Sequence, residues 1–202
     1  MAHVRKGNRA MKPALLIVDM LKDTFEGHPE TELVQAARNF LPRLNEWLDW
    51  FHEQKFPVVF ACDSFYQDDF IFRGRMEPHS LRGTRGAEVI DELHRSSSDL
   101  VLAKRRFSAF FKTDLDQTLR TWQVDTIVIA GIATHVCVLS TALDAVSNDF
   151  SAIILDDCCA AHRKEYHEPL LNAFRKTPLF PLLRVCDSET CRQLLATQES
   201  AS

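Results

Sequence analysis

The chain has 202 residues, of which 46% are hydrophobic and 26% charged, so it can bury the core of one globular domain over 1–202. Its formal net charge of -4 offers no electrostatic basis for binding nucleic acid. No window approaches the roughly 18 apolar residues of a membrane span, and no signal peptide is evident. The six cysteines include no CxxC pair, which favours reduced thiols. We therefore expect a cytoplasmic protein without nucleic-acid or membrane partners.

Residues 1–12 are basic and lack an apolar run, so we expect a flexible N-terminal extension there. Beyond it, short runs rich in Val, Ile and Leu alternate with stretches of helical periodicity. The expected strands are 14–18, 57–62, 99–103, 126–130, 152–155 and 181–185. The expected helices are 31–53, 84–94, 112–122, 135–147 and 165–176.

This alternation predicts an α/β fold with three layers, in which helices cover both faces of an open, six-stranded, mostly parallel, Rossmann-like sheet. The segment 63–83 is polar, aromatic and weakly periodic, which is typical of a long functional loop. In such a fold the ligand site lies beyond the carboxyl ends of the strands, where the strand order reverses.

Three reactive side chains follow three of the expected strands. Asp19 comes after ALLIV, Lys104 after DLVLA, and Cys137 a few residues after TIVIAG, where a strand turns into a helix. Each also has an ordinary interpretation, as a helix-capping aspartate, a solvated lysine and an inert buried cysteine. Since the strand ends share one edge of the sheet, however, we expect the three side chains to meet there.

Together the three groups would suit nucleophilic catalysis. A helix N-terminus favours the thiolate form of Cys137, and free N–H groups at that position can bind an oxyanion. Asp19 can take the thiol proton and deliver it to a leaving amine, while Lys104 stabilises the carboxylate and the developing thiolate.

Four sequence blocks carry a resemblance to a known family. They are ALLIVDM with Asp19, PHSLRGTRGAEV at 78–89, LAKRRFSAF with Lys104, and VIAGIATHVCVLSTALDA with Cys137. In order and spacing they resemble the isochorismatase-like cysteine hydrolases, which include nicotinamidases, N-carbamoylsarcosine amidases, ureidoacrylate amidases and isochorismatases. The resemblance implies the family fold, a triad of Asp19, Lys104 and Cys137, and a cis peptide between Ile132 and Ala133. It also implies that the N–H groups of Ala133 and Cys137 form the oxyanion hole.

The resemblance fails at the metal site of nicotinamidases. Asp63 and His79 match two of the metal ligands, but Phe65 stands where the family has a histidine. Zinc usually has at least three protein ligands. We therefore expect no metal and no other cofactor, with Asp63 and His79 as weak candidates that otherwise hydrogen-bond within the loop.

Aromatic and basic residues near the expected site suggest a partly apolar pocket for a small-molecule substrate. The pocket candidates are Phe25, Phe65, Tyr66, Phe107 and His135. One of four nearby arginines is a candidate for binding a substrate carboxylate, namely Arg73, Arg75, Arg82 or Arg85. Family relatives often assemble, so we expect a homo-oligomer, either a dimer or a tetramer.

The expected function is hydrolysis of a small amide, ureide or related bond through a thioester on Cys137. The alternatives are a vinyl-ether hydrolase of the isochorismatase type and a catalytically silent relative that binds a ligand or a protein. A nucleotide-binding protein is disfavoured, because neither GxGxxG nor GxxxxGK[ST] occurs.

Overall fold

One parallel sheet organises the protein. In the computed structural model, which describes residues 11–199, six strands lie in the order β3-β2-β1-β4-β5-β6, and all neighbouring pairs are parallel. The strands are β1 (Pro13–Val18), β2 (Val58–Asp63), β3 (Leu100–Lys104), β4 (Thr126–Ile132), β5 (Ser151–Ala160) and β6 (Leu183–Cys186). The predicted fold class is confirmed, and the sheet is entirely parallel. Its strand order reverses between β1 and β4, which is where such sheets bind ligands.

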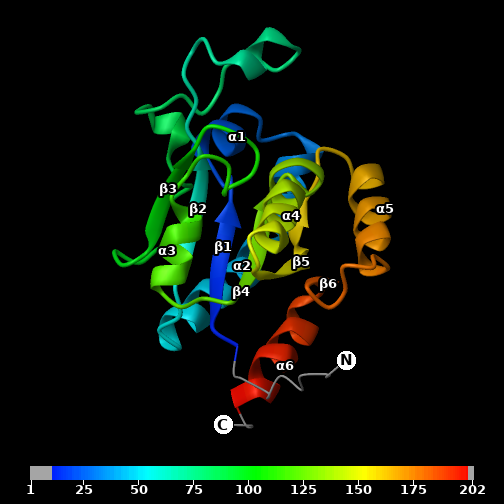
Figure 1. Cartoon of the computed structure of the whole chain (residues 1–202). Helices are drawn as coiled ribbons and strands as arrows, with labels where there is room; N and C mark the ends of the chain where they lie inside the picture. The colour runs from blue at the N-terminus through cyan, green and yellow to red at the C-terminus, as the bar shows by residue number, and fades with distance from the viewer. Residues whose placement is uncertain (1–10, 200–202) are drawn as a thin grey trace.

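Helices cover both faces of the sheet (Figure 1). Those on one face are α2 (Glu32–Glu53) and α6 (Ser188–Glu199), and those on the other are α3 (Leu115–Thr121), α4 (Leu139–Ser147) and α5 (Lys164–Arg175). In β1, Leu15 and Ile17 belong to the core under α2, whereas Leu16 and Val18 belong to the opposite core. This alternation follows from the two-residue period of a strand, so both faces of the sheet are buried.

The helix predicted at 84–94 is wrong. Only a single 3-10 turn, η2 (Arg85–Ala87), forms there, and the rest of the segment pairs with the chain that leaves β1. The Ile90 N–H donates to the Met20 carbonyl at 3.1 Å, and Val89 forms an antiparallel bridge with Leu21. The buried apolar residues of this segment therefore have the spacing of a helix, but the segment pairs with extended chain. Its hydrogen bonds to the chain after β1 prevent the helix that the spacing predicts.

Several boundaries also differ from the sequence prediction. The short helix α1 (Lys22–Gly27) and all of α6 were not predicted, and α3 begins three residues later than expected. Lys112, where the helix was expected to begin, has a φ of 54°, which is not helical. The segment 63–83 is irregular apart from the 3-10 turn η1 (Phe70–Arg73), in line with the predicted loop.

The predicted N-terminal extension lies largely outside the described residues, which begin at Met11. Lys12 is held in place, because its N–H donates to the Asp125 carboxylate at 3.0 Å and its carbonyl accepts the Asp125 N–H at 3.0 Å. Among residues 11–199 no helix is long and apolar enough to cross a membrane.

Candidate active site

Asp19 lies just beyond β1, at the carboxyl edge of the sheet and beside the reversal of strand order. Its backbone has a φ of 53°, in the left-handed region, and its N–H donates to the Ala61 carbonyl of β2 at 2.9 Å. On the other side Gly131 of β4 comes so close to β1 that an added Cβ would lie 2.2 Å from the Val18 carbonyl oxygen. An unusual backbone conformation for a non-glycine residue is often kept at a functional site.

Lys104, at the end of β3, is fully buried and contacts two carboxylates. Its Nζ lies 2.8 Å from Asp19 Oδ2 and 2.5 Å from Asp63 Oδ1. Burial by itself lowers the pKa of a lysine, but the negative charges that Asp19, Cys137 and Asp63 carry when ionised outweigh it and raise the pKa of Lys104. The side chain is therefore a permanent cation inside the protein.

Cys137 lies in the π-helical turn η3 (Thr134–Val138) that runs directly into α4, and 7% of its surface is exposed. Its Sγ and carboxylate oxygens of Asp19 and Asp63 all lie within 4.8 Å of one another. The structure thus brings together the three residues predicted from strand ends, and it adds Asp63 to them.

The expected thiolate form of Cys137 needs correction. Burial is the largest cause that raises the pKa of the thiol, and the charge of Asp19 raises it further, while Lys104 acts in the opposite direction. The resulting pKa is well above the ordinary value, so the resting residue is a neutral thiol. The helix N-terminus does not overcome desolvation, and a base must remove the proton before the sulfur can attack.

Asp63 is the last residue of β2, and its contact with Lys104 was not predicted from the sequence. Its carboxylate accepts from Lys104, and its backbone N–H donates to Asp19 Oδ1 at 2.8 Å. Burial and the nearby charge of Asp19 raise the pKa of Asp63 to about 7, against the opposing effect of Lys104. The sequence signal that could have found this role is its position, since Asp63 ends the strand between those that lead to Asp19 and Lys104.

The residues of the nicotinamidase metal site do not fit a metal here. Asp63 accepts from Lys104, whereas His79 bonds the Glu77 carbonyl through Nδ1 at 2.9 Å. The rings of His79 and Phe65 have centroids 5.4 Å apart. An ammonium group already provides the positive charge between the carboxylates, so a cation there would have to displace it or overcome its repulsion.

The loop before Cys137 contains the other predicted features. The peptide between Ile132 and Ala133 is cis. His135 is half-buried, and its Nδ1 is a buried atom without a hydrogen-bond partner among the described residues. Its ring centroid lies 5.2 Å from that of His162 and 5.5 Å from that of Tyr166. Burial, followed by the effect of His162, lowers the pKa of His135, so this imidazole is neutral at neutral pH.

The predicted aromatic pocket is only partly assembled. Phe25 lies in the core with 1% of its surface exposed, so the structure does not support its place in a pocket wall. Phe65 is equally buried and packs edge-on against Phe72 at 5.3 Å. Tyr66 is exposed, and the guanidinium groups of Arg82 and Arg105 lie over its ring. Phe107 packs at the margin of the core that contains Cys137. Contact of any of them with a substrate stays a prediction.

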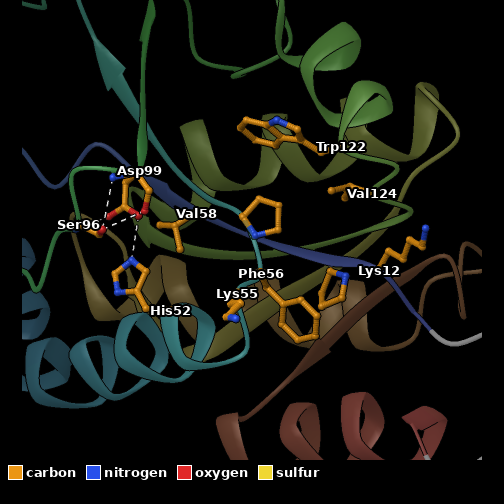
Figure 2. Close-up of a pocket in the computed structure, with 12 residues that line it drawn as sticks. Lys12, His52, Lys55, Phe56, Val58, Ser96, Asp99, Trp122 and Val124 are labelled. Carbon is orange, nitrogen blue, oxygen red and sulfur yellow. Dashed lines mark hydrogen bonds and ion pairs between the residues drawn. The ribbon is translucent and has the colours of Figure 1, made fainter.

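Two hollows lie at opposite ends of the sheet. A cavity of about 600 Å³ at the carboxyl end, which we call the carboxyl-end cavity, is lined by the segments that follow β1, β2 and β5. Its lining residues are Asp23, Thr24, Gly27, His28, Thr31, Leu33, Met76, Glu77, Pro78, His79 and His162. A hollow of about 770 Å³ at the amino end, the amino-end hollow, lies among His52, Asp99, Trp122 and their neighbours (Figure 2).

These features define a class: a parallel α/β protein with a buried cluster of Asp19, Lys104 and Cys137 at the reversal of strand order. A family model described as the isochorismatase domain matches residues 13–185. The chain therefore belongs to the isochorismatase family of hydrolases.

Similar proteins of known structure cover most of the chain. An isochorismatase-like hydrolase from Alkaliphilus metalliredigens is 31% identical, with a TM-score of 0.79 over 91% of this chain and 98% of that one. N-carbamoylsarcosine amidase from Thermoplasma acidophilum is 33% identical, with a TM-score of 0.75 over 89% of this chain and 98% of that one. A probable inactive nicotinamidase from Arabidopsis thaliana is 31% identical over 76% of this chain and 83% of that protein.

Proposed function

We propose that this protein is a cysteine hydrolase that cleaves a carbon–nitrogen bond of a small amide or ureide. The observation that carries the proposal is the cluster in which Cys137 Sγ and a carboxylate oxygen of Asp19 lie within 4.8 Å, with Lys104 Nζ 2.8 Å from that carboxylate. The similarity to N-carbamoylsarcosine amidase, at 33% identity, supports the same class of bond.

The first half-reaction forms a thioester. Asp19 takes the thiol proton as the Cys137 sulfur attacks the carbonyl carbon, which suits a thiol that is neutral at rest. The carbonyl oxygen becomes an oxyanion, for which we propose the N–H groups of Ala133 and Cys137 as donors. When the carbon–nitrogen bond breaks, the leaving nitrogen takes the proton from Asp19.

The second half-reaction releases the acid. Water loses a proton to Asp19 and attacks the thioester carbon, and the sulfur leaves and recovers that proton. Lys104 stabilises the anionic form of Asp19 and the sulfur charge in both halves, because its ammonium is buried against them.

Replacement of the nucleophile tests the mechanism. Cys137→Ala should reduce turnover of any amide or ureide that the wild type cleaves by at least about 10³-fold, as expected when a nucleophile is deleted. Cys186→Ala, which removes a half-buried thiol from β6, is the matched control and should retain the wild-type rate. Retention of most of the activity by Cys137→Ala would refute the covalent route.

A second candidate is a catalytically silent relative that only binds a ligand. It is favoured by the burial of Cys137 and by the similarity to a protein described as a probable inactive nicotinamidase. A screen of small amides, ureides and vinyl ethers separates the possibilities. Turnover of vinyl ethers that persists in Cys137→Ala would instead favour chemistry of the isochorismatase type, which needs no thiol nucleophile.

We also propose that the protein works in a reducing compartment such as the cytoplasm, because all six cysteines are free thiols. A homodimer or homotetramer and the absence of a cofactor stay predictions. Sedimentation velocity tests the first, and metal analysis together with activity after chelation tests the second.

A further inference from the structure

The carboxyl-end cavity lies at the same edge of the sheet as the candidate active site, although Asp19, Lys104 and Cys137 are not among the residues that line it. It is lined from segments that follow β1, β2 and β5, which end at the same edge of the sheet as β4 and Cys137. A direct contact joins the two, since His162 lines the cavity and its ring lies 5.2 Å from that of His135, two residues before the nucleophile. A substrate that reaches Cys137 by this route passes the cavity walls.

The charge of these walls is negative. Asp23 and Glu77 are carboxylates, and no lysine or arginine is present among the described residues that line the cavity. Burial lowers the pKa of His162, so its ring is neutral at neutral pH. Asp23 is fixed in place, because its Oδ2 accepts the Ser80 N–H at 2.5 Å and a Cβ on Gly86 would collide with its carboxylate.

Three of the four arginines that could have bound a substrate carboxylate make contacts elsewhere, and the fourth, Arg75, is not among the residues that line the carboxyl-end cavity. Arg85 forms a bidentate pair with Glu26. Arg82 donates to the Ser64 hydroxyl at 3.2 Å and lies over the Tyr66 ring. Arg73 lies over the exposed Phe70 ring, 5.8 Å from its centroid. None of these side chains lines the carboxyl-end cavity.

We propose that the carboxyl-end cavity leads to Cys137, and that it selects small amides or ureides that are neutral or cationic and rejects those that carry a carboxylate. This inference rests on the proposed function and narrows its substrate class. An anionic substrate would meet the carboxylates of Asp23 and Glu77 before it reached Asp19 and Asp63, with Lys104 as the one cation of the cluster. Repulsion of this kind discriminates between substrates as effectively as attraction.

Small alkylating reagents that differ in charge test the proposal without knowledge of the substrate. Iodoacetamide is neutral, iodoacetate is anionic and 2-bromoethylamine is cationic, and all are small. The modification rate of Cys137 by each is measured by peptide mass spectrometry and divided by the rate for free 2-mercaptoethanol. We expect the normalised iodoacetate rate to be at least about tenfold below that of iodoacetamide, with 2-bromoethylamine equal to or above iodoacetamide. The difference should shrink in 0.5 M salt, which screens charges.

Variants assign the effect to the cavity. Glu77→Lys should raise the normalised iodoacetate rate several-fold, whereas Glu53→Lys at the amino end should not change it, although both reverse one exposed charge. Iodoacetate that reacts as fast as iodoacetamide in the wild type would overturn the charge selection and leave the proposed function standing. Retention of amide or ureide turnover by Cys137→Ala would overturn the proposed function, and the inference with it.

Discussion

The two ends of the sheet differ in how completely their buried polar groups are paired. In the amino-end hollow, the buried Asp99 carboxylate accepts from the Ser96 N–H at 2.7 Å and pairs with His52 Nε2 at 2.8 Å (Figure 2). At the carboxyl end, one lysine contacts two carboxylates beside a buried thiol, and His135 Nδ1 has no partner among the described residues.

The comparison teaches that hollow volume is a poor guide to function. The amino-end hollow has the greater volume of the two. Its buried carboxylate, Asp99, nevertheless has hydrogen-bond partners in Ser96 and His52, as expected where such contacts only hold α2 against the segment before β3. The carboxyl end keeps groups with displaced pKa values in close contact, which is the usual property of a catalytic site.

The largest effect is expected at Lys104. Lys104→Met removes the cation and leaves the carboxylates of Asp19 and Asp63 buried against each other, which should lower the free energy of unfolding by about 3–5 kcal/mol. Urea unfolding at pH 7.5 measures the change, and hydrolytic activity should be lost in the same variant. Lys176→Met, an exposed residue at the end of α5, serves as the control. A wild-type unfolding midpoint for Lys104→Met would contradict the buried ion cluster.

A smaller effect is expected at His52. His52→Ala removes one partner of the buried Asp99 carboxylate, which should cost about 1–3 kcal/mol of stability. The kcat/KM of the enzyme should stay within a factor of about two at a temperature where the variant is folded. Loss of activity without loss of stability would show that the two ends are coupled, and the comparison would then fail.

A third prediction concerns the pH dependence of stability. An aspartate in the unfolded chain loses its proton near pH 4, but folded Asp63 keeps it up to a pKa of about 7. The stability that its protonated form contributes is therefore full below pH 4 and is lost as the pH rises through about 7. Relative to Asp63→Asn, the wild-type free energy of unfolding should fall across this range by at most about 1.4 kcal/mol per pH unit.

Urea unfolding of both proteins at intervals between pH 4 and 8 measures this slope. Parallel pH profiles for the wild type and Asp63→Asn would mean that Asp63 titrates normally. The close approach of the two carboxylates would then not raise the pKa of Asp63, and the contrast between the two ends of the sheet would be weaker.

The sequence by itself determined which reactive residues meet. Asp19, Lys104 and Cys137 follow apolar strand segments, and parallel strands with right-handed crossovers bring their carboxyl ends to one edge. The continuous apolar runs predicted the strands, and the helical spacing predicted α2, α4 and α5, to within a few residues, because their apolar residues face a core made by the same elements. The 84–94 segment shows the limit, since its apolar spacing alone does not distinguish a helix from pairing with the chain after β1.

Only the tertiary structure decided the state of the reactive groups. Cys137 was expected as a thiolate from its place near a helix N-terminus, but burial raises the pKa of its thiol. Asp63, a weak metal candidate in the sequence, is a partner of Lys104, and Arg73, Arg82 and Arg85 contact groups outside the cavity. Protonation and cavity charge depend on desolvation and on groups brought together from distant segments, and no local pattern of residues encodes those distances.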